Sequence, residues 1–202
     1  MPNRSSVAGD PCVLDALRSA TRARHANLSS SPAMSRLFAS DYTISEYRAH
    51  LGRLLGFFEP LEIAASHLSD SEASLMAIQR SSDLREDLRI MGATAGDIDA
   101  LKRCPTPPSI SRAGLRGYIY VILGSTLGAK VIVRQLRAVL GLEASFCFYG
   151  DEDGRYQTAW GSFRLELEEI GREDVDAICA TAAGIFDAYA TWFSEPALRI
   201  EG

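Results

Sequence analysis

Cysteine is scarce in this chain, and the few cysteines that occur are scattered. The 202 residues include four of them, none in the C-x-x-C spacing of a zinc or redox motif: Cys12, Cys104, Cys147 and Cys179. This distribution excludes a disulfide framework and favours reduced thiols. Long apolar runs are also missing, since no window reaches the roughly 18 apolar residues of a membrane span. Residues 1–9 carry no apolar export signal. We therefore expect a cytoplasmic protein with no membrane partner.

Clustered positive charge is the second feature that the chain lacks. Its 21 Lys and Arg residues are spread along the sequence and outnumbered by 26 Asp and Glu, which gives a formal net charge of −5. A protein that binds nucleic acid concentrates Lys and Arg into a patch, so no nucleic-acid partner is expected. A hydrophobic content of 47% and a charged content of 23% are ordinary for a globular protein. At this length we expect one folded domain over residues 10–202, preceded by a disordered segment over residues 1–9.

The apolar residues near the start of the chain follow a helical period. Asp10 and Pro11 are typical of a helix opening, because aspartate caps the first turn and proline there sacrifices no hydrogen bond. A helix is predicted from there to about Asn27. Its apolar stripe, at three- and four-residue steps, is Leu14, Leu17, Thr21, His25 and Leu28. The pattern therefore predicts that the His25 imidazole lies on the apolar face of the first helix.

Further helices account for the rest of the sequence. A T-x-x-E capping box at Thr43 and Glu46 predicts the start of a second long helix, which we expect Pro60 to kink. The remaining patterns predict helices near residues 72–80, 83–91, 97–103, 112–140, 156–170 and 174–193, with a proline-rich loop at 105–108. Gly141 is placed to cap the helix that ends at residue 140. No strand series or internal repeat is present. The predicted fold is an all-α, single-domain helical bundle.

Four glycines interrupt the predicted helix over residues 112–140. Gly114, Gly117, Gly124 and Gly128 each cost roughly 0.5–1 kcal/mol relative to alanine in a helix interior. They favour either a close crossing of two helices or a deliberate bend that leaves bare backbone for a flat ligand. The residues alone leave both readings open.

Histidine offers few candidates for metal ligation. Of His25, His50 and His67, only His25 lies on a clear apolar stripe near the start of the chain. A single buried histidine is more often a hydrogen-bonded core residue than a ligand. Neutral imidazole is nonetheless the usual axial ligand of haem iron, so His25 is the candidate ligand if haem binds. His50 and His67 are interpreted as surface or second-layer residues.

Two segments of the chain resemble the signatures of the haem oxygenase family. The first is Leu17-Arg18-Ser19-Ala20-Thr21 before His25, and the second is Tyr120-Val121-Ile122-Leu123 before Gly124-Ser125-Thr126-Leu127-Gly128. They occur in the family's order and separation. Weaker similarities extend over nearly the whole chain, at residues 83–92, 140–141, 160–163 and 186–192. The likeness is greatest to the bacterial branch often found beside bacteriophytochromes.

The resemblance implies a fold and an activity. In that family haem lies between a proximal helix and a kinked distal helix, which implies that His25 ligates the iron and that Gly124, Ser125 and Gly128 lie over the opposite face. Haem is then both cofactor and substrate. Its ring is opened with O₂ to biliverdin, CO and ferrous iron, with electrons from an external ferredoxin- or flavoprotein-type donor. The phytochrome-associated branch implies that the biliverdin serves as a bilin chromophore, with a bacteriophytochrome as its recipient.

The resemblance also implies which residues contact the haem propionates and which others line the pocket. Arg18 matches a basic position of the family, and Thr21 lies within the first signature. Tyr118, Tyr120 and Arg164 are further candidates. An arginine on a helix is most often simply solvated, so Arg18 and Arg164 could each be surface residues that do not contact haem.

Two positions depart from the family pattern. Ser125 stands where mammalian-type members carry a distal aspartate that organises water, and Ser29 stands where many members place a glutamate that accepts the second ring proton of the histidine. Because of these departures, a non-enzymatic haem-binding or carrier protein with the same fold remains an alternative. A helical-bundle enzyme that binds no haem is a more distant one, because one fold hosts many functions.

Overall fold

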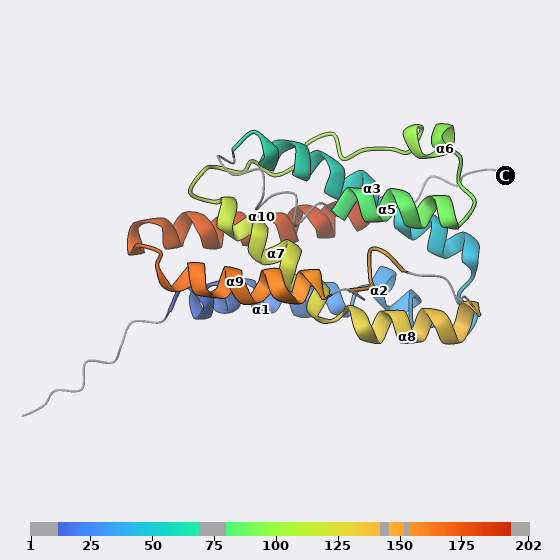
Figure 1. Cartoon of the computed structure of the whole chain (residues 1–202), viewed down its shortest axis with the longest axis horizontal. Helices are drawn as coiled ribbons and strands as arrows, with labels where there is room; N and C mark the ends of the chain where they lie inside the picture. The colour runs from blue at the N-terminus through green and yellow to red at the C-terminus, as the bar shows by residue number, and fades with distance from the viewer. Residues whose placement is uncertain (1–11, 69–79, 142–145, 152–153, 195–202) are drawn as a thin grey trace, which may run out of the picture.

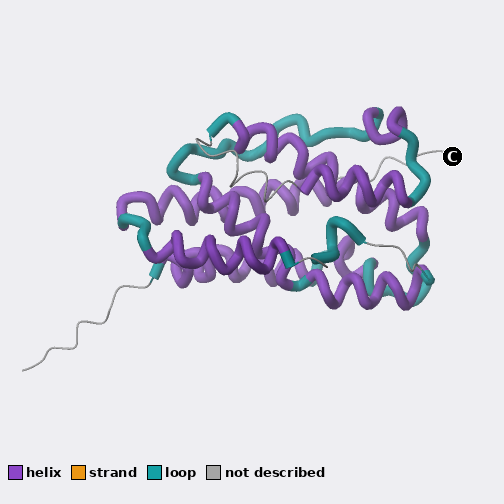
Figure 2. Tube along the Cα trace, in the orientation of Figure 1, coloured by secondary structure: helices purple, strands orange, loops and turns teal. Residues whose placement is uncertain are grey.

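The structure is a bundle of helices. A computed structural model describes residues 12–68, 80–141, 146–151 and 154–194. Within these ranges there is no strand (Figure 2), which confirms the predicted all-α fold. The helices in chain order are α1 (Val13–Ser29), α2 (Pro32–Arg36), α3 (Ile44–Ser66), α5 (Arg80–Ile90), α6 (Ala95–Asp99), α7 (Leu115–Leu127), α8 (Ala129–Leu140), α9 (Arg155–Glu168) and α10 (Val175–Ser194), with a short 3₁₀ turn at Arg172–Asp174. The segment expected to be disordered, 1–9, and the helix expected at 72–80, except for residue 80, lie outside the described residues.

The predicted capping box is present and ties α3 to α2. The Thr43 hydroxyl accepts a hydrogen bond from the Glu46 backbone N–H at 3.2 Å, and the Glu46 carboxylate accepts one from the Thr43 N–H at 2.9 Å. Arg36, at the end of α2, donates to the same carboxylate at 2.7 Å. The long helix continues through Pro60 and ends at Ser66. Its start is therefore fixed by side chains from both sides of the α2–α3 connection.

The helix predicted over residues 112–140 begins later, at Leu115, and it is divided by a bend, which is one of the two readings of its glycines. α7 ends at Leu127, α8 begins at Ala129, and their axes differ by 44°. Gly141 ends α8 in the left-handed conformation, with a φ of 62°, as predicted. The helix predicted at 97–103 is also too long, since α6 ends at Asp99. No single described helix is long and apolar enough to cross a bilayer, whereas α7 and α8 taken together pass that test as a bent pair.

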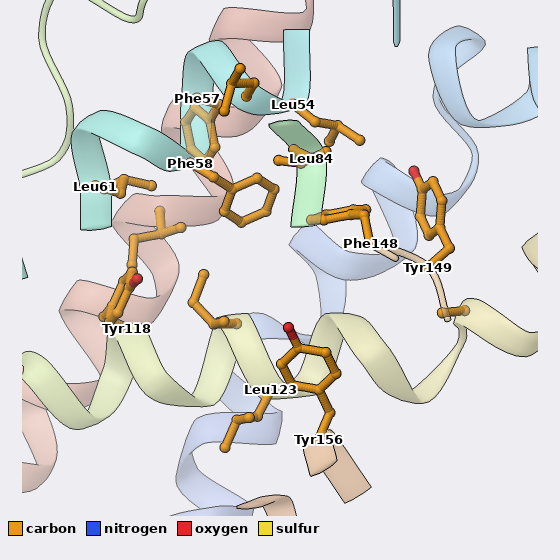
Figure 3. Close-up of a cluster of buried hydrophobic side chains, with 14 of the residues drawn as sticks. Leu54, Phe57, Phe58, Leu61, Leu84, Tyr118, Leu123, Phe148, Tyr149 and Tyr156 are labelled. Carbon is orange, nitrogen blue, oxygen red and sulfur yellow. The ribbon is translucent and has the colours of Figure 1, made fainter. Parts of the chain in front are cut away.

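Helix α10 is the element on which the bundle is assembled. It packs against both α1 and α7, while α3 packs against α5, and α9 lies beside α7 and α1 (Figure 1). The interior between these pairs is filled by large side chains, among them Phe57 and Phe58 from α3 and Tyr118 from α7 (Figure 3). Because α1 and α7 both lie against α10, this helix sets the distance between them.

The four glycines of the α7 region have two different surroundings. A Cβ on Gly117 would clash with the backbone carbonyl of Ile178 on α10, and one on Gly114 would clash with the Thr181 hydroxyl. A Cβ on Gly124 or Gly128 would meet no described atom within 4 Å. The first pair therefore permits a close helix crossing, and the second pair faces open space. The close crossing therefore lies at Gly114 and Gly117, and the bend lies at the other two glycines.

We predict opposite effects on stability from alanine at the two kinds of position. Gly117→Ala should lower the free energy of unfolding by about 1–3 kcal/mol, because the new methyl group must push α7 away from α10. Gly124→Ala should raise it by up to about 1 kcal/mol, because it removes backbone freedom without any clash. Urea unfolding of the protein without added ligand measures both. Equal stability of the two variants would contradict the assignment of the helix crossing to Gly117.

Candidate functional site

A cavity of about 840 Å³ lies between α1, α3, α7 and α10. This volume is within the range of about 300–1,000 Å³ that is usual for small-molecule sites. Most of the lining is apolar or aromatic, which suits a large hydrophobic ligand. The polar groups are concentrated on α1 and α7, and these two helices form opposite walls.

The α1 wall carries the predicted histidine. The apolar stripe of this helix is buried at Leu14, Leu17 and Thr21, and it becomes exposed at His25, where the cavity opens. The His25 ring contacts the Phe186 ring edge-on, with 6.1 Å between centroids. No described residue forms a hydrogen bond with the His25 ring; the Ser29 hydroxyl instead donates to the His25 backbone carbonyl at 2.9 Å. The imidazole therefore retains both nitrogens for a ligand or water.

The opposite wall is the C-terminal half of α7 and the start of α8. Gly124, Ser125 and Gly128 all line the cavity. The Ser125 hydroxyl donates to the Ile122 carbonyl and the Thr126 hydroxyl to the Leu123 carbonyl, each at 2.7 Å. Such bonds from a side chain to the preceding turn bend helices, and these two come directly before the 44° bend. The bend exposes backbone at the two glycines to the cavity.

Seven of the nine residues predicted for the site lie in this one cavity. They are Arg18, Thr21, His25, Tyr120, Gly124, Ser125 and Gly128. Thr21 and Tyr120 also connect the two walls, since their hydroxyl oxygens are 3.4 Å apart.

The other two predicted residues do not line the cavity. Tyr118 is 1% exposed and lies in the core, because two residues along a helix turn the side chain about 200° away from the face of Tyr120. Arg164 is exposed on α9, one turn beyond the lining residue Trp160.

The cavity also includes residues that sequence reasoning missed. Arg22 lies between Arg18 and His25 on the same face of α1, and its spacing of four and three residues from them is a signal that could have identified it. Arg18 is paired at 3.4 Å with Asp15 in an exposed ion pair, whereas Arg22 has no ion pair with any described residue. Further aromatic lining comes from distant parts of the chain, at Phe57, Phe58, Phe148, Tyr149, Trp160 and Tyr189. Only the fold brings these segments to one cavity.

Comparison with known proteins decides the family. The family model described as "Heme oxygenase" matches residues 13–195. The chain belongs to the haem oxygenase family. A protein named heme oxygenase from Xanthomonas campestris pv. campestris (strain 8004) is 39% identical over 89 residues, which are 43% of this chain and 48% of that protein. The chain thus matches about half the length of this relative.

Two solved structures share the fold of this haem oxygenase family member. The heme oxygenase of Leptospira interrogans is 19% identical, with a TM-score of 0.71 over 92% of this chain and 100% of that one. Heme oxygenase-1 of the cyanobacterium Synechocystis sp. PCC6803, in complex with heme, is 17% identical, with a TM-score of 0.68 over 92% of each chain. The predicted haem oxygenase fold is confirmed.

Residues 146–151 contribute Phe148 and Tyr149 to the cavity lining. Polar residues of α5 form hydrogen bonds with the backbone of this segment. The Asp87 carboxylate accepts hydrogen bonds from the backbone N–H groups of Cys147 at 2.7 Å and Phe148 at 2.9 Å. Burial raises the pKa of Asp87, and these N–H groups oppose that shift. Arg80, also buried, donates to the Phe148 carbonyl and lies 4.3 Å from the centre of the Phe148 ring. The positions of Phe148 and Tyr149 therefore depend on α5.

His50 is buried behind this wall, in agreement with its interpretation as a second-layer residue, whereas His67 is exposed. The His50 Nε2 is 2.7 Å from the Tyr149 hydroxyl, and the two rings are stacked. Burial, with a smaller effect of Arg53, lowers the pKa of His50 to about 4. The imidazole is therefore neutral at neutral pH.

We predict that His50 makes the fold sensitive to mild acid. The unfolded chain takes up a proton at this residue below about pH 6.5, which the folded chain does not do until about pH 4. The neutral, buried His50 therefore contributes to the free energy of unfolding above pH 6.5, and this contribution is lost as the pH falls toward 4. Between about pH 7.5 and 5, His50 should account for a loss of about 2 kcal/mol. Urea unfolding at both pH values, for the parent and His50→Gln, measures the difference. An identical pH dependence in the two proteins would show that His50 is not the group responsible.

Proposed function

We propose that this protein is a haem oxygenase that opens the porphyrin ring of haem with O₂ to give biliverdin, CO and ferrous iron. The observation that carries the proposal is the pairing of the cavity's two walls. One wall offers an imidazole with no hydrogen bond to a described residue, and the other offers two glycines whose backbone is uncovered. A flat ligand with a metal at its centre fits between such walls, because one face needs a ligand atom and the other needs space.

Each wall would have its own part in holding haem. His25 would ligate the iron, and Gly124 and Gly128 would leave the opposite face open to O₂. When bound, haem supplies the iron that activates O₂ and is itself the molecule oxidised. The rings of Phe57, Phe58 and Phe148 would exclude bulk water from the cavity.

The proximal side of this chain would orient His25 without a carboxylate. The Ser29 hydroxyl already donates its proton to the His25 carbonyl, so toward the imidazole it has only lone pairs to offer. It would accept the ring N–H in place of the glutamate found in other members. Phe186, in edge contact with the ring, would fix the plane of the imidazole.

The cations of α1 would bind the two propionates of haem. Arg18 and Arg22 are one helical turn apart, and both line the cavity. Guanidinium groups match carboxylates in geometry as well as charge. Thr21 and Tyr120, whose hydroxyls meet, would add polar contacts between the walls.

The wider setting of the reaction is also a proposal. No side chain supplies the electrons that the reaction consumes, so they would come from an external ferredoxin- or flavoprotein-type donor. We propose bilin chromophore supply in the cytoplasm, with a bacteriophytochrome as the recipient of biliverdin. The likeness of the two signatures to the phytochrome-associated branch supports this purpose.

Spectroscopy on one sample separates the proposal from its alternatives. Titration of the protein with ferric haem should give a sharpened absorption band that saturates at one haem per chain. Adding a reductant and O₂ should then bleach the band and produce a bilin pigment. A saturable band that survives reductant and O₂ would instead indicate a carrier. No band at all would indicate a helical protein that does not bind haem.

His25→Ala tests the assignment of the iron ligand. The variant should fold, because His25 is exposed and its ring has no hydrogen bond to a described residue, but its haem spectrum should change and its turnover should be lost. Addition of free imidazole should restore the parent spectrum by filling the space left by the side chain. A variant with the spectrum and activity of the parent would remove His25 from the site.

Arg18→Ala combined with Arg22→Ala tests the propionate contacts. Because both side chains are exposed, each contact is worth no more than about 1 kcal/mol, and the double variant should bind haem about three- to tenfold more weakly. It should also yield a broader mixture of biliverdin isomers, since the ring is freer to rotate. Arg164→Ala, on an exposed part of α9 outside the cavity, is the matched control. Equal losses in the double variant and the control would refute the placement of the propionates on α1.

A further inference from the structure

Two tyrosines form a polar part of the cavity wall, with a buried histidine behind them. They are Tyr149, which follows α8, and Tyr189 on α10, and the histidine is His50 on α3. His50 and Tyr149 are hydrogen-bonded at 2.7 Å, with their rings 10° from parallel. The Phe193 ring contacts His50 at 5.9 Å and stacks on Tyr189 at 4.2 Å between centroids. Both tyrosines line the cavity.

The two tyrosines stand out because the lining around them is apolar. Their neighbours in the lining are leucine, isoleucine and phenylalanine side chains, among them Phe148, which lies beside Tyr149, and Phe58, which lies beside Phe148 (Figure 3). Burial raises the pKa of both phenols, that of Tyr149 further because of the neighbouring Tyr189. Near neutral pH the wall therefore contains hydroxyl groups that keep their protons and carry no charge.

Some hydrogen-bonding positions of the two tyrosine hydroxyls remain unused at this wall. A tyrosine hydroxyl has one donor and two acceptor positions, and the bond to His50 uses only one of the three on Tyr149. No described residue forms a hydrogen bond with the Tyr189 hydroxyl, which lines the same cavity. A hydroxyl with unused hydrogen-bonding capacity beside a cavity can bind an ordered water.

Ser125, on the opposite wall, has no hydroxyl proton left to donate toward the cavity. Its hydroxyl donates its single proton to the Ile122 carbonyl, and the residue has no carboxylate. Tyr149, in contrast, is held on two sides, because Asp87 and Arg80 fix its backbone segment and His50 fixes its hydroxyl. Position and remaining capacity both favour Tyr149 as the point where water is anchored.

We propose that the Tyr149 hydroxyl, aimed by His50, binds and orients the water that supplies protons inside the haem cavity during ring opening, in place of the acidic residue that other members carry where this chain has Ser125. His50 acts through Tyr149 and is a positioning residue. Tyr189 provides a second contact for the same water. The inference rests on the proposed function.

The rival interpretation is that His50 and Tyr149 only satisfy each other in the core. The two interpretations differ for Tyr149→Phe, which removes one hydroxyl and keeps the ring. A core pair predicts a loss of stability alone. A water anchor predicts that the polarity inside the cavity changes as well.

The test compares Tyr149→Phe with Tyr47→Phe as a matched control. Tyr47 is fully buried on α3, its hydroxyl has no hydrogen bond to a described residue, and it does not line the cavity. The readouts are the C–O stretching frequency of the ferrous haem–CO complex and the initial rate of haem bleaching per folded molecule. A hydrogen-bond donor near CO lowers this frequency. Tyr149→Phe should therefore raise it and slow bleaching about three- to tenfold, as expected from the loss of one hydrogen bond. Tyr47→Phe should change neither.

Variants of His50 test its positioning role. His50→Leu should reproduce the spectral shift of Tyr149→Phe. His50→Gln should restore the parent frequency, because its amide also reaches the hydroxyl. If the His50 variants are too unstable to bind haem, the two tyrosine variants decide the question alone. A Tyr149→Phe protein with the frequency and rate of the parent would overturn the inference and leave the proposed function intact. A parent protein that binds no haem would overturn both.

Discussion

The close approach of α7 to α10 at Gly117 is the constraint on which the site depends. A side chain there would clash with the Ile178 carbonyl, so only glycine allows the two backbones to meet. Helix α1 packs against another part of α10, which makes α10 the common support of both cavity walls. Because packed helices do not slide freely, this contact sets how far apart His25 and the glycines at the end of α7 lie. Farther along, α7 leaves α10, and its end at Gly124 and Gly128 faces open space.

A second support is polar and lies under the aromatic lining. The buried side chains of Arg80, Asp83 and Asp87 hold residues 146–151 and α9 against α5. Buried charges are costly unless they are compensated. Arg80 lies 3.9 Å from Asp83 and against the rings of Phe148 and Tyr156, and Asp87 accepts hydrogen bonds from backbone N–H groups. Hydrogen-bonded polar groups of this kind specify the geometry of the cavity wall more closely than apolar packing alone would. This specificity matters most for Tyr149, whose hydroxyl has a single direction set by His50.

Local chemistry explains which features the sequence could predict. The capping box at Thr43 and the left-handed Gly141 depend on neighbouring residues, and both were predicted correctly. The face of α1 that carries Arg18, Thr21 and His25 follows from helical spacing in the same way. The bend at Gly128 was foreseen as one of two readings of the glycines, and choosing between them required knowing what lies opposite each one.

Long-range packing accounts for what the sequence did not reveal. Tyr118 and Tyr120 look equivalent in the sequence, but only the neighbours of α7 decide which of them faces the cavity and which the core. Arg164 is one turn past the cavity lining, a boundary that no periodicity marks. The partnership of His50 with Tyr149 joins residues 99 positions apart. The segment that carries Tyr149 follows no helical or strand pattern, so its place in the wall could come only from the structure.

We propose above all that haem lies between α1 and the bent α7–α8 pair. A crystal structure of the protein grown with ferric haem tests it most directly. We predict iron within bonding distance of a His25 ring nitrogen, the opposite face of the porphyrin over the backbone of Gly124 and Gly128, and the propionates toward Arg18 and Arg22. Haem bound elsewhere on the protein, or in this cavity with its iron ligated by another residue, would contradict the account.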